Sequence, residues 1–410
     1  MKPIHVTSEI QKLKKVLVHR PGDELKFLTP NTLEELLFDD IPDLVKAQKE
    51  HDSFAEILRN EGVEVVYLED LMAETLDANE GLRDKFLEEF LDDANVKSPL
   101  YRDALTEFYK GIKDTKEFVL KTMAGVSLKE LGDLHSDTLP GRMEKNSFLA
   151  LNPMPNLYFT RDPYASCGDN VIINHMFSTT RNRETIYSDY IFKNHPEYKG
   201  QVTDLYGRHN QHHIEGGDVF NYSKDTLFIG ISQRTTADAI QVLAKNIFFG
   251  PAKTEIKRIC AFSIPVSRAF MHLDTVFTQI DTDAFTYHPG IESTLQVFEL
   301  TPDKDETIKI NEFEGSLGDI LARIMGMKEV RLFPCGGGDP MAAEREQWND
   351  GSNTLTIAPG KVVVYKRNYV TNEMLKKSGI NLIELDADNL TVGRGGPRCM
   401  SMPLVREDAE

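Results

Sequence analysis

The stretch "VGRGGPRCMSMP", residues 392–403, contains a pattern that recurs elsewhere in the chain. A strand-like run leads into a polar, glycine-rich loop, and a second run follows. The same order occurs around "HHIEGGDVF" (212–220), "FMHLDTVF" (270–277) and "FPCGGGDP" (333–340). The spacing is irregular, so an exact repeat is not inferred. Because the polar residues collect in these loops, we predict a site built at one end of several similar units.

Other strand-like runs alternate with helical segments along most of the chain. They are rich in β-branched and aromatic residues, which favour strands. The runs are "GVEVVYL" (62–68), "NVIIN" (170–174), "DTLFIGIS" (225–232), "DTVFTQI" (274–280) and "KVVVYK" (361–366). The segment "TLTIAPGKVVVYK" predicts a hairpin that turns at Pro359 and Gly360. This alternation is typical of an α/β fold.

The stretch from about residue 76 to residue 132 differs from the rest, because it is highly charged and its apolar residues recur at helical spacing. The two apolar stripes are Leu82, Phe86 and Phe90, and Leu105, Phe108, Tyr109 and Ile112. Neither stripe is flanked by strand-like runs. We therefore predict a helical insertion domain at 76–132, within a larger domain formed by residues 1–75 and 133–410.

Composition narrows the class of protein. The chain has 410 residues and a formal net charge of -18. This charge argues against nucleic acid or an anionic membrane as a partner and would suit a cationic substrate. No apolar run approaches the roughly 18 residues of a membrane span, and the first residues lack the apolar core of a signal peptide. The four cysteines, Cys167, Cys260, Cys335 and Cys399, form no C-x-x-C pair. We expect a cytoplasmic protein with reduced thiols and no zinc knuckle.

Five loop residues are candidates for catalysis, and each also has a purely structural interpretation. Asp162 before a proline and Glu215 before two glycines are both compatible with turns. His272 and Asp274 are two residues apart in an apolar run, so we expect them on the same face of a strand. A single cysteine is more often inert than reactive, but Cys399 lies beside backbone amides and arginines that favour a thiolate.

Together these side chains indicate a thiol nucleophile, a histidine acid/base and several carboxylates. So many acids beside a thiolate are costly unless the substrate is a cation. A guanidinium fits, because it is planar, always charged and presents paired N–H donors to carboxylates. Before substrate binds, the carboxylates should hold the thiol protonated, and a bound cation should relieve this effect.

The motifs "FTRDP", "EGGDV", "HLDTVF" and "GRGGPRCMSMP", with "ELLFDD" at 35–40, resemble the arginine deiminase family over essentially the whole chain. The resemblance implies a five-bladed, pseudo-symmetric α/β propeller of ββαβ units with an inserted helical domain. It also implies hydrolysis of L-arginine to L-citrulline and ammonia without a metal or other cofactor. A cytosolic role in arginine catabolism and a homo-oligomer, either a dimer or a tetramer, are further implications.

The resemblance also assigns roles to individual residues. Cys399 matches the nucleophile, His272 the general acid/base and Glu215 the carboxylate beside this histidine. Asp162 and Asp274 match the acids that hold the guanidinium. The implied substrate contacts and pocket walls are Asn156, Phe159, Arg181, Arg234, Leu37 and Gly393, with Arg394 as a mobile arginine at the mouth.

Three alternatives stay open at this point. An amidinotransferase or a dimethylarginine hydrolase would use the same kinds of residues. A metallohydrolase could draw its ligands from a second set of residues: His212, His213, Glu215, Asp218, His272 and Asp274. Adjacent histidines point apart on an extended strand, which argues against that set. The third alternative is an arginine-binding protein without catalytic activity.

Overall fold

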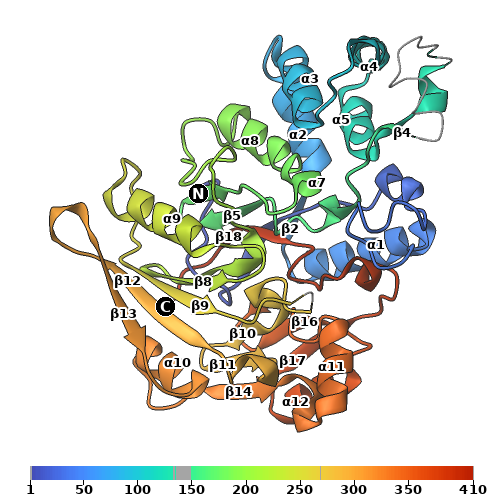
Figure 1. Ribbon diagram of the computed structural model, residues 1–410. Helices are drawn as coiled ribbons and strands as arrows, with labels where there is room; N and C mark the ends of the chain where they lie inside the picture. Colours follow the sequence, from blue (N-terminus) through green and yellow to red (C-terminus); the bar gives the residue numbers. More distant parts are fainter. Residues whose placement is uncertain (1, 133, 135–148, 268, 410) are drawn as a thin grey trace.

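The computed structural model describes residues 2–132, 134, 149–267 and 269–409 (Figure 1). It has a mixed α/β fold built from several small sheets, which confirms the predicted α/β class. Among the described residues, no helix combines the length and the apolar character that crossing a membrane requires.

The two ends of the chain form one sheet. Strand β18 (Met402–Arg406) pairs antiparallel with β1 (Leu13–Val18), and β2 (Glu64–Tyr67) pairs parallel with β1 on its other side. Helix α1 (Leu44–Asn60) connects β1 to β2. The order is therefore an antiparallel pair, a helix and a third, parallel strand. This arrangement brings the C-terminal loop next to the start of the chain.

Other sheets of the described chain repeat this order, so we call each one a unit. The antiparallel pairs are β5 (Tyr164–Cys167) with β6 (Asn170–Ile173), β7 (Val219–Ser223) with β8 (Thr226–Ile231), β10 (Phe277–Asp281) with β11 (Ala284–Tyr287), and β15 (Leu355–Ala358) with β16 (Lys361–Tyr365). The parallel third strands are β9 (Arg258–Ser263), β14 (Arg331–Pro334) and β17 (Asn381–Leu385), and β6 has a parallel bridge from Val171 to Asp204 in their place.

Helices lie between the second and third strands of these units, mostly on the outside of the molecule (Figure 1). They are α7 (Thr179–Asn182), α8 (Thr185–Asn194), α9 (Ala237–Phe249), α10 (Leu317–Met325) and α12 (Tyr369–Lys377). A hairpin of β12 (Gln296–Pro302) and β13 (Ile308–Phe313) extends the sheet of β9.

The charged stretch after the first unit is helical, as predicted. It contains α2 (Leu68–Asp77), α3 (Leu82–Asp93), α4 (Pro99–Gly111) and α5 (Thr115–Ala124), followed by the short strands β3 (Val126–Ser127) and β4 (Leu149–Leu151). Phe86, Phe90, Leu105 and Tyr109 of the two stripes are fully buried. Their hydrophobic cluster continues into the units of β5 and β7, and α2 begins before residue 76. The division into two domains at 76–132 stays a prediction.

Each predicted strand run contains a strand, and the hairpin turns at Pro359 and Gly360. Two predictions about the loops are wrong. In "FMHLDTVF" the strand begins only at Phe277, and His272 is the N-cap of the short helix η6 (Leu273–Thr275). The Leu273 N–H donates to Asp218 at 2.7 Å, and the Thr275 hydroxyl donates to the His272 carbonyl at 2.7 Å. These bonds to side chains replace the ladder of a strand.

The loop "FPCGGGDP" does not belong with the other loops, because no strand follows it. Strand β14 leads into the short helix η9 (Cys335–Gly338) and then into α11 (Pro340–Trp348). Gly336 and Gly337 have φ of 76° and 63°, so the backbone turns away through the left-handed region that glycine tolerates. The fully buried Cys335 lies apart from the cavity described next.

Candidate active site

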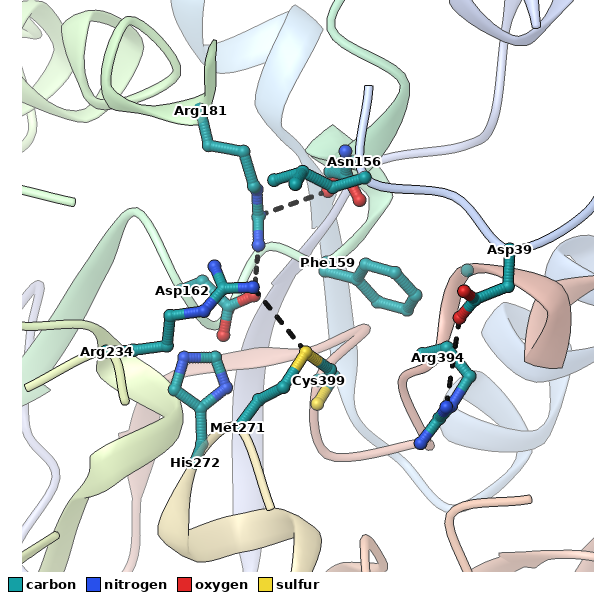
Figure 2. Close-up of a pocket in the computed structure, with 12 residues that line it drawn as sticks. Asp39, Asn156, Phe159, Asp162, Arg181, Arg234, Met271, His272, Arg394 and Cys399 are labelled. Atoms are coloured by element: carbon teal, nitrogen blue, oxygen red, sulfur yellow. Dashed lines mark hydrogen bonds and ion pairs between the residues drawn. The ribbon is translucent and has the colours of Figure 1, made fainter. Parts of the chain in front are cut away.

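Residues that come just before the first strand of a unit meet at one cavity or directly behind it. Asp162 precedes β5, Glu215 precedes β7, His272 precedes β10 and Cys399 precedes β18. The cavity is small and partly open to solvent. Its lining residues are Leu37, Asp39, Asn156, Phe159, Asp162, Arg181, Arg234, Met271, His272, Gly393, Arg394 and Cys399 (Figure 2). The fold therefore joins loops that are far apart in the sequence.

All the predicted site residues except Glu215 and Asp274 line this cavity. These two acids lie directly behind it. Glu215 contacts His272 and Asp274 contacts Cys399, and both acids are completely buried.

The sulfur of Cys399 lies between an amide and a carboxylate. Asn353 Nδ2 is 3.0 Å from Sγ, and Asp274 Oδ2 is 3.6 Å from it. Burial raises the pKa of Cys399 well above its usual value. The nearby charges that act on it are Asp274, Asp162 and Asp350, which raise the pKa further, and Arg398, which lowers it. Burial and the acids therefore outweigh the cationic loop and hold the thiol protonated, as expected for the site before substrate binds, and the loop alone does not produce a thiolate.

His272 and Glu215 form a buried pair. His272 Nε2 is 2.7 Å from Glu215 Oε2, and Glu215 Oε1 accepts the N–H of Phe177 at 3.0 Å. Burial alone would lower the pKa of His272, but the carboxylates of Asp162 and Glu215 outweigh it and raise the pKa to about 9. A Cβ at Gly217 would lie 2.7 Å from the imidazole ring, so this position needs glycine. At neutral pH the imidazole is therefore charged and could donate a proton.

Asp162 and Asp274 each have one oxygen engaged by an arginine. Arg181 donates to Asp162 Oδ2 at 2.7 Å, and Arg398 donates to Asp274 Oδ2 at 2.8 Å. Within the described part of the chain, Oδ1 of each acid is buried and has no hydrogen-bond partner. A buried carboxylate oxygen without a donor is costly, so both acids are suited to a ligand with N–H groups.

The other predicted substrate contacts differ in how many hydrogen bonds their side chains already make within the protein. The Arg181 guanidinium donates to Asp162, to Glu184 at 2.8 Å and to the Asn156 carbonyl at 3.4 Å. Arg234 Nε has no hydrogen-bond partner among the described residues, although its guanidinium stacks 5.4 Å from the Phe177 ring. The Arg234 side chain therefore has an N–H donor available for an anion, whereas the Arg181 guanidinium is held by Asp162, Glu184 and Asn156.

Aromatic and left-handed residues shape the mouth of the cavity. Leu37 and Arg394 have φ of 62° and 65°. The Arg394 guanidinium carbon lies 3.4 Å from the centre of the Trp348 ring, and Arg394 Nη1 is 3.8 Å from Asp39. A Cβ at Gly393 would lie 2.0 Å from the Tyr158 hydroxyl, so the chain passes too close for any other residue.

Sequence reasoning missed several residues that surround the sulfur and the acids. Asp39 and Met271 line the cavity, and Asn353, Asp350 and Arg398 act on Cys399 or Asp274. Asn353 has a sequence signal, since "DGSNT" (350–354) is a polar loop just before a strand run. Asp39 and Arg398 lie inside motifs that were already quoted, but nothing in one sequence ranks them above their neighbours.

In the folded structure, the residues that could bind a metal differ from the set named for the metallohydrolase alternative. Within the described residues, Asp162, Glu215 and His272 place one ligand atom each within 4.8 Å of one another. His213 is directed elsewhere, because its Nδ1 is 2.8 Å from the Arg234 carbonyl. The six residues therefore do not form a single cluster. The effect of a chelator on activity tests whether Asp162, Glu215 and His272 bind a metal.

Comparison with known proteins places this site in a family. The family model "Arginine deiminase" matches residues 34–406. The chain belongs to the arginine deiminase family. Its relatives include the arginine deiminase of Treponema denticola, 54% identical over 409 residues, which are 100% of both chains. The arginine deiminase of Streptococcus gordonii is 54% identical over 408 residues, 99% of each chain. The predicted membership is confirmed, and with it the prediction that the chain is an enzyme.

Solved structures at lower identity share the fold of this arginine deiminase family member. SxtG, an amidinotransferase from Microseira wollei, superposes with a TM-score of 0.54 at 13% identity and covers 99% of this chain and 98% of its own. The N-terminal domain of ArgZ, an arginine dihydrolase of cyanobacteria, has a TM-score of 0.53 at 11% identity and covers 96% and 97%. At this identity the likeness concerns the fold alone.

Proposed function

We propose that the chain hydrolyses L-arginine to L-citrulline and ammonia through a covalent intermediate on Cys399. The observation that carries this proposal concerns two buried oxygens beside a buried thiol, Asp162 Oδ1 and Asp274 Oδ1, which have no hydrogen-bond partner in the described part of the chain. A guanidinium has N–H groups for both oxygens and the charge that both acids require. The names of the relatives support arginine as the guanidinium compound.

The first half of the reaction breaks a carbon–nitrogen bond. Asp162 and Asp274 hold the guanidinium so that its carbon faces Cys399 Sγ. The cation offsets the nearby acids, the thiol loses its proton to solvent, and the thiolate forms a C–S bond. His272, as imidazolium, protonates the departing nitrogen, which leaves as ammonia. An S-alkylthiouronium remains on Cys399.

The second half consumes one water molecule. His272, now neutral, takes a proton from water, and the hydroxide adds to the same carbon. As the C–S bond breaks, the hydroxyl proton passes to solvent, the carbonyl of citrulline forms, and the thiolate is released. Glu215 keeps the pKa of His272 high, so that the imidazole returns to its charged form for the next cycle.

The remaining contacts would hold the amino-acid end of the substrate. We assign the α-carboxylate to Arg234, because its Nε has no partner among the described residues, and to Asn156 at the same cavity. Arg181 is better suited to position Asp162, since its guanidinium is held by Glu184 and Asp162. Leu37, Phe159 and Gly393 form walls, and Arg394 serves as a mobile residue at the mouth.

The finer points of architecture belong to the same proposal. The β–β–α–β order of the units supports their interpretation as the blades of a five-bladed propeller around the site. The helices of 76–132 are proposed as an insertion domain. A cytosolic role in arginine catabolism, a dimer or tetramer, and a reaction without metal or cofactor follow from the family resemblance.

The deciding experiment measures citrulline and ornithine from L-arginine with the wild type, Cys399→Ser and Cys335→Ser. We expect citrulline from the wild type and from Cys335→Ser, because Cys335 lies outside the cavity. Cys399→Ser should keep less than about 1% of the activity, since serine has no adequate base there. An acid quench should leave an adduct on the Cys399 peptide, which mass spectrometry detects.

Three outcomes would contradict this function. Release of ornithine in place of citrulline would favour a dihydrolase or an amidinotransferase. Loss of activity in EDTA, with survival in iodoacetamide, would favour a metal centre at Asp162, Glu215 and His272. Arginine binding without any turnover by the wild type would favour a binding protein.

A further inference from the structure

Asn353 holds a position equivalent to that of the proposed catalytic residues. It lies two residues before β15, the first strand of its unit, just as Asp162 lies two residues before β5. Cys399 lies three residues before β18. Asn353 is completely buried, although it is polar and lies in a loop. The unit that contains Asn353 therefore also contributes a polar side chain to the centre of the molecule.

The hydrogen bonds of Asn353 determine which way its amide faces. The Cys399 N–H donates to Asn353 at 3.1 Å, so the atom at that end must be the oxygen, Oδ1. The nitrogen, Nδ2, then faces the sulfur at 3.0 Å and the Asp274 carbonyl at 3.1 Å. Both of these groups accept hydrogen bonds, so the assignment satisfies the whole amide. The amide directs an N–H donor at Sγ.

The surroundings prevent Asn353 from moving away. Its N–H donates to the Asp350 carbonyl at 3.0 Å, and the Thr278 hydroxyl donates to the carbonyl of the preceding residue, Ser352, at 2.6 Å. Gly396 of the cysteine loop packs so closely that a Cβ there would lie 2.2 Å from the Asn353 carbonyl oxygen. The donor is therefore held in place before any substrate binds.

The charge balance around Cys399 makes such a donor useful. The ionisable groups that act on the sulfur or share its cavity are Asp162, Asp274, Asp350, Asp39, His272, Arg181, Arg234, Arg394, Arg398, Tyr158 and Tyr365. The acids raise the pKa of Cys399, and Asp274 is only 3.6 Å from the sulfur. A neutral N–H donor stabilises the thiolate without repelling the incoming guanidinium, which a cation at that position would do.

We propose that Asn353 is a further catalytic residue of this site: its Nδ2–H group holds Cys399 Sγ in place and stabilises the thiolate when it attacks and when it is released. The role rests on the proposed function, because it assumes that Cys399 is the nucleophile. It does not depend on turnover for its test, since the ionisation of a thiol can be followed without substrate.

The test compares Asn353→Asp with the wild type. Aspartate keeps the shape and the acceptor for the Cys399 N–H, but it replaces the donor with a carboxylate oxygen. Asn353→Ser removes the amide without adding a charge and decides the question if Asn353→Asp does not fold. The matched control is Asn221→Ala, because Asn221 is also buried and bridges backbone groups, at Ser166 and Gly168, away from the sulfur.

The main readout is the rate of Cys399 alkylation by iodoacetamide against pH, followed by mass spectrometry of its peptide. A hydrogen bond to a charged group predicts an alkylation rate about 10- to 100-fold lower in Asn353→Ser at pH values below the thiol pKa, and a profile that moves to higher pH by about one to two units. The shift should be larger in Asn353→Asp, because this variant also places a negative charge beside the sulfur. kcat should fall by a similar or larger factor, and KM for arginine should change little. Asn221→Ala should keep the wild-type profile.

Two results would overturn the proposal. One is an alkylation profile of folded Asn353→Asp or Asn353→Ser that coincides with that of the wild type. The other is a fall in melting temperature with an unchanged kcat, which would make Asn353 a structural residue only. Failure of the proposed function is distinguishable from both, because then the wild type itself would form no citrulline.

Discussion

Removing the negative charge of Asp274 should make Cys399 easier to ionise, even though it should abolish turnover. Asp274 is the strongest of the charges that raise the pKa of Cys399, with Oδ2 3.6 Å from the sulfur. An asparagine side chain has nearly the same shape as an aspartate but no charge, so Asp274→Asn tests the charge. Ionisation of Cys399 should become easier while turnover is lost, because the Asp274 carboxylate opposes the thiolate and is also proposed to hold the guanidinium.

The size of the shift follows from the distance. Two unit charges 3.6 Å apart interact by about 5 kcal/mol at an effective dielectric constant of about 20, which corresponds to about three pKa units. Arg398 donates to the same oxygen at 2.8 Å and offsets part of this repulsion. We therefore expect the pKa of Cys399 to fall by about one to three units in Asp274→Asn.

The assay is the pH dependence of Cys399 alkylation by iodoacetamide, without substrate. Cys335 serves as an internal reference in every digest, because burial raises the pKa of this thiol to about 11 and Asp274 is not among the groups that act on it. Asp189→Asn is the matched control, since Asp189 is a buried carboxylate that pairs with Lys193 outside the cavity. Only Asp274→Asn should alkylate faster at neutral pH.

An unchanged profile, or one that moves to higher pH, would refute the electrostatic reasoning. It would mean that the acids do not control the thiol, and that a bound guanidinium would not promote its ionisation either. The same conclusion would follow if a non-reactive guanidinium compound left the ultraviolet absorbance of the Cys399 thiolate unchanged at every pH.

Further predictions concern the histidines and the mouth of the site. Glu215→Gln should lower the pKa of His272 from about 9, because it removes a carboxylate that raises it, so kcat/KM should begin to fall at a lower pH than in the wild type; an unmoved alkaline limb would contradict this. Burial and the nearby charge of the His19 imidazole lower the pKa of His51 to about 3, so its neutral form stabilises the fold above pH 6.5 and this contribution is lost as the pH falls toward 3. The loss in melting temperature between pH 7 and pH 4 should therefore be smaller in His51→Leu, and an equal loss in both proteins would exclude this role. The only tryptophan, Trp348, stacks on Arg394, so citrulline should change its fluorescence in the wild type but not in Arg394→Leu if Arg394 moves; identical responses would show that it stays in place.

Local sequence patterns predicted most of the secondary structure. The β-branched runs became strands, and the stripes of Phe86 and Leu105 became buried helix faces. The prediction failed at His272 and at Cys335. Next to His272, the Leu273 N–H donates to Asp218, more than fifty residues earlier, in place of the strand that the local pattern favoured. At Cys335, glycines with positive φ turned the chain away from the centre.

The sequence also predicted one part of the candidate site and missed another. The sequence by itself determined which side chains could do chemistry, because acids, a histidine and a thiol in glycine-rich loops are visible without coordinates. It also indicated a cationic substrate. It did not reveal Asn353, because the proposed role of this residue depends on contact with Cys399 Sγ, 46 positions away in the chain.

The sequence indicated that carboxylates oppose the Cys399 thiolate, but only the tertiary structure decided how strongly each group acts on the sulfur. The pKa of a thiol depends on burial and on the distance to each neighbouring charge, and both are set by the packing of loops from different units. Asp274 and Arg398 are 124 positions apart, yet they share a hydrogen bond beside Cys399. For this reason the pKa of Cys399 is raised in the folded protein, although the sequence places arginines beside it.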